Sequence, residues 1–147
     1  MATLAELLAS GPYEWLQGSL DQHIAGVSAD SRKVETGWAF VAVRGLRVDG
    51  HQFLAQALSR GASAVVVERG SPLTLPPAVA CVGVDDSRRA LAQMAAAFYG
   101  QPSRHLCLIG VTGTSGKTTS TYLLEAMLRA QSVTPGVIGT VTGLVPV

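Results

Sequence analysis

A short stretch of the chain, residues 110–119, contains the residue types that bind phosphate groups. It reads Gly-Val-Thr-Gly-Thr-Ser-Gly-Lys-Thr-Thr and lies between an apolar run and a pattern typical of a helix. A phosphate chain carries several negative charges, so it binds best to backbone N–H groups at a helix N-terminus with a mobile cation beside them. The stretch is therefore predicted to be a phosphate-binding loop between a strand and a helix.

The residues of this loop have distinct expected roles. Gly113 and Gly116 allow the backbone to approach the phosphates closely, and Lys117 can reach the β and γ oxygens. Thr118 can offer its hydroxyl to Mg²⁺. The usual pattern G-x-x-x-x-G-K-[ST] has glycine where this sequence has Val111, and the alternative interpretation is a glycine-rich turn that binds nothing.

The composition of the 147 residues is that of an ordinary globular chain, with 48% hydrophobic and 14% charged residues. The net charge is +1 and the basic residues are scattered, so neither nucleic acid nor a membrane is an expected partner. The first residues lack the basic segment of a signal peptide, and Cys81 and Cys107 lie in apolar patterns typical of buried thiols. These features predict a cytoplasmic protein.

The part of the chain before the loop has the apolar periodicity of an α/β domain. Helices are expected to begin near residue 4, near residue 53 with Phe53 on the apolar face, and near residue 87 with Asp86 or Ser87 as the cap. Strands are expected at 24–29, 38–43, 64–67 and 78–84. Turn residues at 99–103 then predict a boundary between two well-patterned units. We therefore expect residues 1–101 to form one small α/β domain and residues 102–147 to begin another.

The second part predicts one β-α-β unit of a P-loop ATPase-type domain, with strands at 105–111 and 137–141 around a helix. The residues predicted to form the buried stripe of this helix are Leu123, Leu124, Met127 and Leu128. A parallel sheet normally needs more strands and helices on both faces. The second domain is therefore expected to be truncated, with this helix poorly covered.

Four stretches of the sequence together resemble the Mur ligase family. They are residues 30–43, 45–51 and 98–103 and the loop at 110–119, in this order. The run from Tyr-Gly-Gln-Pro-Ser at 99–103 into the loop is most similar to the family members that add the third, diamino residue to the peptidoglycan peptide. The Asp-Ser-Arg and Asp-Gly-His elements also occur in the member that adds the terminal dipeptide, which stays an alternative.

The resemblance implies an ATP-dependent ligase that forms an amide bond. ATP would phosphorylate the terminal carboxylate of a UDP-N-acetylmuramoyl-dipeptide, and the amine of meso-diaminopimelate, L-lysine or L-ornithine would then displace phosphate. Lys117 would be the catalytic cation and Thr118 the residue that binds Mg²⁺. The ATP-binding residues implied are Gly113, Thr114, Ser115, Gly116, Lys117, Thr118 and Thr119. The full-length enzyme is expected to be a monomer, and this chain by itself to be inactive.

The resemblance also implies that the first domain binds the UDP moiety of the substrate. The residues so placed are Ser31, Ala29, Leu46, Arg47 and Val48. Without the resemblance, residues 30–32 are better interpreted as a turn capped by Asp30. The three histidines, His23, His51 and His105, lack the spacing of metal ligands and are expected in surface or packing roles.

Two other classes of protein stay open at this point. One is a UDP-sugar or nucleotide-binding module without catalysis. The other is a P-loop kinase or GTPase, which is disfavoured by Val111 and by the domain that precedes the loop.

Overall fold

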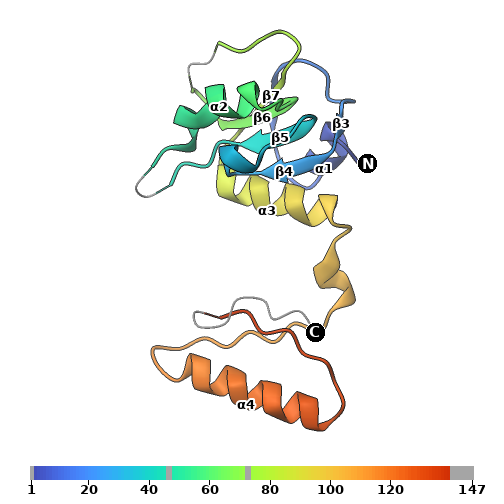
Figure 1. Cartoon of the computed structure of the whole chain (residues 1–147), viewed down its shortest axis with the longest axis vertical. Helices are drawn as coiled ribbons and strands as arrows, with labels where there is room; N and C mark the ends of the chain where they lie inside the picture. The colour runs from blue at the N-terminus through green and yellow to red at the C-terminus, as the bar shows by residue number, and fades with distance from the viewer. Residues whose placement is uncertain (1, 46–47, 72–73, 140–147) are drawn as a thin grey trace. The chain divides into compact units, whose positions relative to one another are not determined.

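The computed structural model describes residues 2–45, 48–71 and 74–139. By its internal contacts the chain divides into two compact units, the first ending at Leu106 and the second beginning at Cys107 (Figure 1). Each unit is described by itself below. The predicted assignment of residues 1–101 and 102–147 to two functional domains stays a prediction.

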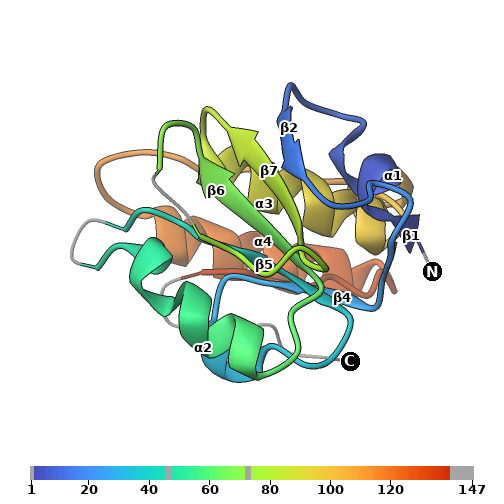
Figure 2. The ribbon, with the colours of Figure 1, turned by 90° about the horizontal axis from the view of Figure 1, so that it is seen from above.

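The first unit is built on a sheet of five strands (Figure 2). Their order across the sheet is β2 (Glu14–Gln17), β7 (Ala80–Val84), β6 (Ala64–Glu68), β5 (Trp38–Val41) and β4 (Gly26–Ser28). The last four strands run parallel, whereas β2 is antiparallel to β7. A separate pair, β1 (Ala2–Thr3) and β3 (His23–Ile24), forms a small antiparallel sheet. The α/β class predicted for this part of the chain is confirmed.

Helices cover both faces of the parallel strands. The helices are α1 (Leu4–Leu8), α2 (Leu54–Ser59) and α3 (Ser87–Phe98), and the short 3-10 turns are η1 (Ser31–Lys33), η2 (Gly50–Phe53) and η3 (Pro102–His105). Successive side chains of a strand point to opposite faces, so alternate residues of β5 and β6 pack against α1 and α3 on one face and α2 on the other. Strands buried on both faces explain the nearly continuous apolar runs in the sequence.

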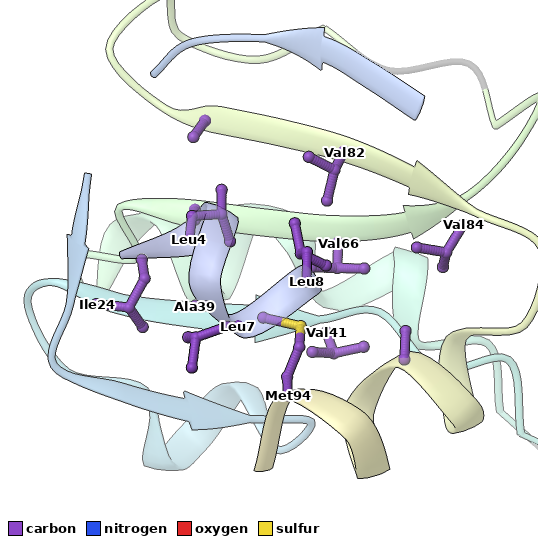
Figure 3. Packing of buried hydrophobic residues seen from close by; sticks show 13 residues of the cluster. Leu4, Leu7, Leu8, Ile24, Ala39, Val41, Val66, Val82, Val84 and Met94 are labelled. Atoms are coloured by element: carbon purple, nitrogen blue, oxygen red, sulfur yellow. The ribbon is translucent and has the colours of Figure 1, made fainter. Parts of the chain in front are cut away.

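The larger of the two cores lies between the sheet and helices α1 and α3 (Figure 3). Its labelled members include Leu4, Leu7, Leu8, Val41, Val66, Val82 and Met94. Local caps hold both helices in place: Thr3 and Glu6 form a reciprocal capping box on α1, and Asp86 accepts from the N–H groups of Arg88 and Arg89 on α3. Asp86, one of the two residues predicted to cap this helix, is therefore its N-cap.

The strand β2 was not predicted from the sequence. Its residues Glu14, Trp15 and Leu16 are exposed, so no alternation of apolar and polar side chains marks it. The strand exists because its backbone pairs with the edge of β7. Similarly, Phe53 was predicted on the buried face of the second helix, but it precedes α2 and is 40% exposed.

The second unit contains one long helix, α4 (Lys117–Ala130). No strand occurs in the described residues on either side of it, 106–116 and 131–139, so the predicted strand at 105–111 is wrong for this structure. The predicted strand at 137–141 lies partly outside the described residues, and 137–139 are not in a strand. A strand needs a neighbour to pair its backbone groups, and neither segment has one here.

The stripe predicted to be buried on this helix is open to solvent. Leu123 is 61% and Met127 66% exposed, and α4 has no buried residue. Cys107 is also exposed, contrary to the prediction, whereas Cys81 is buried as predicted and its burial raises the pKa of its thiol to about 11.

The packing predicts that Met94→Ala destabilises the first unit by about 2 to 5 kcal/mol, since Met94 is fully buried and the smaller side chain leaves a cavity. Urea unfolding of the 147-residue chain measures this change. The matched control is Met127→Ala, the same substitution at a side chain exposed to solvent. Equal midpoints for the two variants would contradict the described core.

Candidate functional site

The polar side chains of the first unit gather where its parallel strands end. Asp30 and Ser31 follow β4, Arg44 follows β5, Glu68 is the last residue of β6, and Ser87 follows β7. The carboxyl ends of parallel strands lie along one edge of the sheet, which is the edge where open α/β folds bind their ligands. This edge, together with the glycine-rich loop of the second unit, supplies two candidate sites.

Asp30 and Arg32 fix the turn after β4. Asp30 caps η1 by accepting from Arg32 N–H at 3.0 Å, and the Arg32 guanidinium bonds the same carboxylate at 2.9 Å. These bonds hold the pKa of Asp30 at about 2, the Arg32 side chain being the main cause. The capped turn expected from residue types alone is therefore present.

Ser31 is 5% exposed, and its Oγ donates to Gln56 Oε1 at 2.6 Å. Gln56 belongs to α2, so this bond joins the turn after β4 to a helix that covers the sheet. The hydroxyl proton is engaged by Gln56, and the oxygen keeps lone pairs that can accept from a ligand N–H. Ala29, directly before this turn, is exposed.

A tight hairpin follows β5, and we refer to its described flanks, residues 43–45 and 48–50, as the edge hairpin. Gly50 N–H bonds Val43 O at 2.9 Å, Gly45 N–H bonds Val48 O at 2.9 Å, and Arg44 and Asp49 form an antiparallel bridge. Val48 is 51% exposed. Leu46 and Arg47, which were predicted to contact UDP, lie outside the described residues.

A network of polar side chains holds the edge hairpin against the neighbouring strands. Asp49 Oδ1 lies 2.6 Å from His51 Nδ1, and His51 Nε2 accepts from Glu68 N–H at 3.1 Å. The Glu68 carboxylate binds Arg44 at 3.3 Å and Ser87 Oγ at 2.9 Å. The pKa of Asp49 is lowered to about 2, chiefly because its carboxylate accepts from the His51 backbone N–H and then from the imidazole.

Sequence reasoning missed this network and assigned His51 a surface or packing role. The partner of its Nε2 lies 17 residues away in the chain, so no local pattern reveals it. One signal was available: an aspartate two residues before a histidine in a turn can orient the imidazole through its Nδ1.

The glycine-rich loop of the second unit ends at the start of α4. The N-cap of this helix is Gly116, whose φ of 75° lies in the left-handed region that favours glycine. Because glycine has no side chain, no side-chain hydrogen bond caps the first turn. The helix therefore begins with N–H groups that an anion can bind.

Lys117 is the first residue of α4, and its Nζ donates to the carbonyl of Gly113 across the loop. The Lys117 ammonium group is therefore tied to the loop that precedes the helix. Thr118 and Thr119 follow in the first turn and are exposed. The seven residues predicted to bind ATP, 113–119, span the loop and the first turn of α4. Backbone N–H groups at a helix N-terminus and the Lys117 ammonium group are donors suited to a phosphate chain.

The described part of the chain contains no cluster of potential metal ligands. Among residues 2–45, 48–71 and 74–139, no group of three or more His, Cys, Asp or Glu side chains could hold a metal ion. The same residues contain no helix long and apolar enough to cross a bilayer.

The parallel sheet with helices on both faces places the first unit in the α/β class. Open α/β sheets bind their ligands at the carboxyl edge, where the polar groups lie in this unit. The family model described as the Mur ligase family, catalytic domain, matches residues 23–99. The chain belongs to the Mur ligase family.

Three relatives illustrate the similarity. UDP-N-acetylmuramoyl-L-alanyl-D-glutamate--2,6-diaminopimelate ligase of Geobacillus thermodenitrificans is 46% identical over 138 residues, 94% of this chain and 27% of the relative. A solved structure of an enzyme with that name is 27% identical, with a TM-score of 0.72 over 99% of this chain and 29% of the other. The MurF ligase of Thermotoga maritima in complex with ADP is 34% identical, with a TM-score of 0.53 over 76% of this chain and 25% of the other. The chain therefore spans about a quarter of the length of these relatives.

The bond between Ser31 and Gln56 should contribute measurably to stability, because it ties η1 to α2 and its donor is buried. A double-mutant cycle with Ser31→Ala and Gln56→Ala is expected to give a coupling free energy of about 0.5 to 1.5 kcal/mol. Urea unfolding of wild type, both single variants and the double variant measures it. Strictly additive effects would mean that the two side chains do not bond in solution.

Proposed function

We propose that this chain is the front part of an ATP-dependent ligase that adds a diamino acid to UDP-N-acetylmuramoyl-L-alanyl-D-glutamate. The observation that carries the proposal is 46% identity, over 94% of the chain, to a ligase named for this reaction. That similarity extends across both candidate sites. We take 2,6-diaminopimelate as the amino acid, following the names of the relatives, in preference to lysine or ornithine.

The proposed chemistry converts a carboxylate into an amide. A carboxylate is a poor electrophile, so its oxygen first takes the terminal phosphoryl group of ATP, giving an acyl phosphate and ADP. The amine of the diamino acid then attacks the acyl carbon, phosphate leaves with the C–O bond electrons, and the nitrogen loses a proton. Catalysis of the first step depends mainly on offsetting the charge of the transferring phosphoryl group.

The loop of the second unit is the proposed ATP site. The backbone N–H groups of residues 113–119 would hold the phosphates, and Lys117 would exchange its bond to the Gly113 carbonyl for a phosphate oxygen. The solved MurF ligase of Thermotoga maritima is in complex with ADP, which supports an adenine nucleotide as a ligand of this family. Mg²⁺ would supply further positive charge, with the Thr118 hydroxyl as one ligand.

The carboxyl edge of the first unit is the proposed UDP site. The uracil ring carries an imide N–H, and the Ser31 oxygen has a lone pair directed away from Gln56 that can accept from such a group. Ala29 is exposed beside this turn, and Val48 is exposed in the edge hairpin. Both could contact the nucleotide. Leu46 and Arg47 are kept in the proposal from the family resemblance alone.

Two alternatives are less well supported. The ligase that adds the terminal dipeptide shares the fold, with 35% identity in the solved MurF structure from Acinetobacter baumannii, whereas the diaminopimelate ligases compared by sequence are 35% to 50% identical. A nucleotide-binding module without catalysis is less well supported because the relatives that match most of the chain are named as ligases. Its distinguishing outcome is a full-length wild-type protein that binds UDP substrate and ATP but forms no amide.

Lys117→Ala in the full-length protein is expected to lower kcat for ligation by about 10²- to 10³-fold, because the transferring phosphoryl group loses its cation. Affinity for the UDP substrate should stay within about twofold, since that substrate binds the other unit. Amide formation and calorimetric binding measure the two quantities. Lys33→Ala, an exposed lysine in η1, is the matched control, and an unchanged kcat in Lys117→Ala would reject the catalytic assignment.

Ser31→Ala should have the opposite profile. Loss of its hydroxyl is expected to weaken binding of the UDP substrate by about 1 to 3 kcal/mol, because the hydrogen bond is buried. The KM for ATP should change little. Ser10→Ala, at an exposed serine outside the edge, serves as the control, and equal affinity of wild type and Ser31→Ala for the UDP substrate would remove Ser31 from the site.

A further inference from the structure

His51 contacts both the edge hairpin, through Asp49, and the carboxyl end of β6, through the Glu68 N–H. We propose that His51, as the tautomer with its proton on Nδ1, is a positioning residue for the UDP substrate: it fixes the edge hairpin to the carboxyl end of β6. This inference rests on the proposed function, because it concerns affinity for that substrate.

The tautomer follows from the two neighbours of the ring. Nε2 faces the N–H of Glu68 at 3.1 Å, and an N–H can only donate, so Nε2 must carry the lone pair. The proton then lies on Nδ1 and points at Asp49 Oδ1, 2.6 Å away. The imidazole is therefore a rigid link from a carboxylate of the hairpin to the backbone of a core strand.

The Glu68 N–H needs this link because β5 leaves the sheet beside it. Ala42 N–H still bonds Val66 O at 2.8 Å, as in a parallel ladder. Two residues further along β6, the neighbouring chain has turned into the edge hairpin. Successive N–H groups of a strand point to opposite sides, and Arg69 N–H bonds Val84 O of β7, so Glu68 N–H points to the side that β5 has left. The imidazole takes the place of the missing strand.

Charged side chains from three neighbouring segments surround the ring. Asp49 faces Nδ1 and accepts from it in either charge state of the ring. The Glu68 carboxylate is turned to Arg44 and Ser87, and Arg44 also lies 3.4 Å from Asp49. A proton on Nε2 would place two donors face to face, so the bond to Glu68 N–H requires the tautomer with its proton on Nδ1.

The experiment uses two substitutions in the full-length ligase, each of which keeps one of the two contacts. His51→Asn can still donate to Asp49 from the δ position but has no acceptor for Glu68 N–H. His51→Gln places an amide oxygen at the ε position and can keep that acceptor. His23→Asn, at an exposed histidine of β3, is the matched control.

The expected result is a KM for the UDP substrate that rises about tenfold in His51→Asn and about threefold or less in His51→Gln, as one hydrogen bond to an ordered loop requires. The KM for ATP and kcat should stay within about twofold in both. In wild type, the nitrogen-15 shifts of the His51 ring should show a protonated Nδ1 and an unprotonated Nε2. This measurement needs no variant, so it tests the assigned tautomer even if His51→Asn fails to fold, and a protonated Nε2 would overturn the inference.

An unchanged KM for the UDP substrate in a folded His51→Asn enzyme would overturn the inference and leave the proposed function intact. So would equal losses in both KM values and kcat, or a His51→Gln variant no better than His51→Asn. A wild-type protein that binds no UDP substrate would instead overturn the proposed function, and this inference with it.

Discussion

The first unit depends on one constraint, the burial of its parallel strands on both faces. Side chains of β5 and β6 pack alternately against the two layers of helices, so a polar group within these strands would lose water without a partner. Polar groups are therefore confined to the places where strands leave the sheet. The carboxyl edge, with Ser31, the edge hairpin and Glu68, is the direct result of that confinement.

The same burial explains how the edge is held rigid. Where the ladder ends, backbone donors lose their neighbours, and side chains from adjacent loops replace them. His51 accepts from Glu68 N–H, and Asp30 accepts from Arg32 N–H. Ser31 is fixed by a helix residue, Gln56. Each bond satisfies a group and also sets the position of a loop, so stability and the geometry of the candidate site are coupled.

The second unit is organised by local backbone conformation rather than by a buried core. Its loop is built from local conformation: a glycine in the left-handed region starts α4 and leaves the helix N-terminus without a capping side chain. Lys117 closes the loop through Gly113. The conformation of this loop needs only these local features, whereas a buried core needs distant partners. That difference explains why the loop is well formed on a helix whose apolar residues, such as Leu123 and Met127, are exposed.

The sequence alone determined the features that depend on neighbours along the chain. Apolar runs located β4 to β7, Asp86 marked the start of α3, and the glycine-rich loop located the start of α4. Tertiary structure decided what depends on partners far away in sequence. Exposed β2 is a strand only because β7 lies beside it, and residues 106–111 form none because no strand among the described residues pairs with them. The role of His51 likewise exists only because the fold brings Glu68 N–H to its Nε2, and a hydrogen bond across 17 residues has no local pattern by which to recognise it.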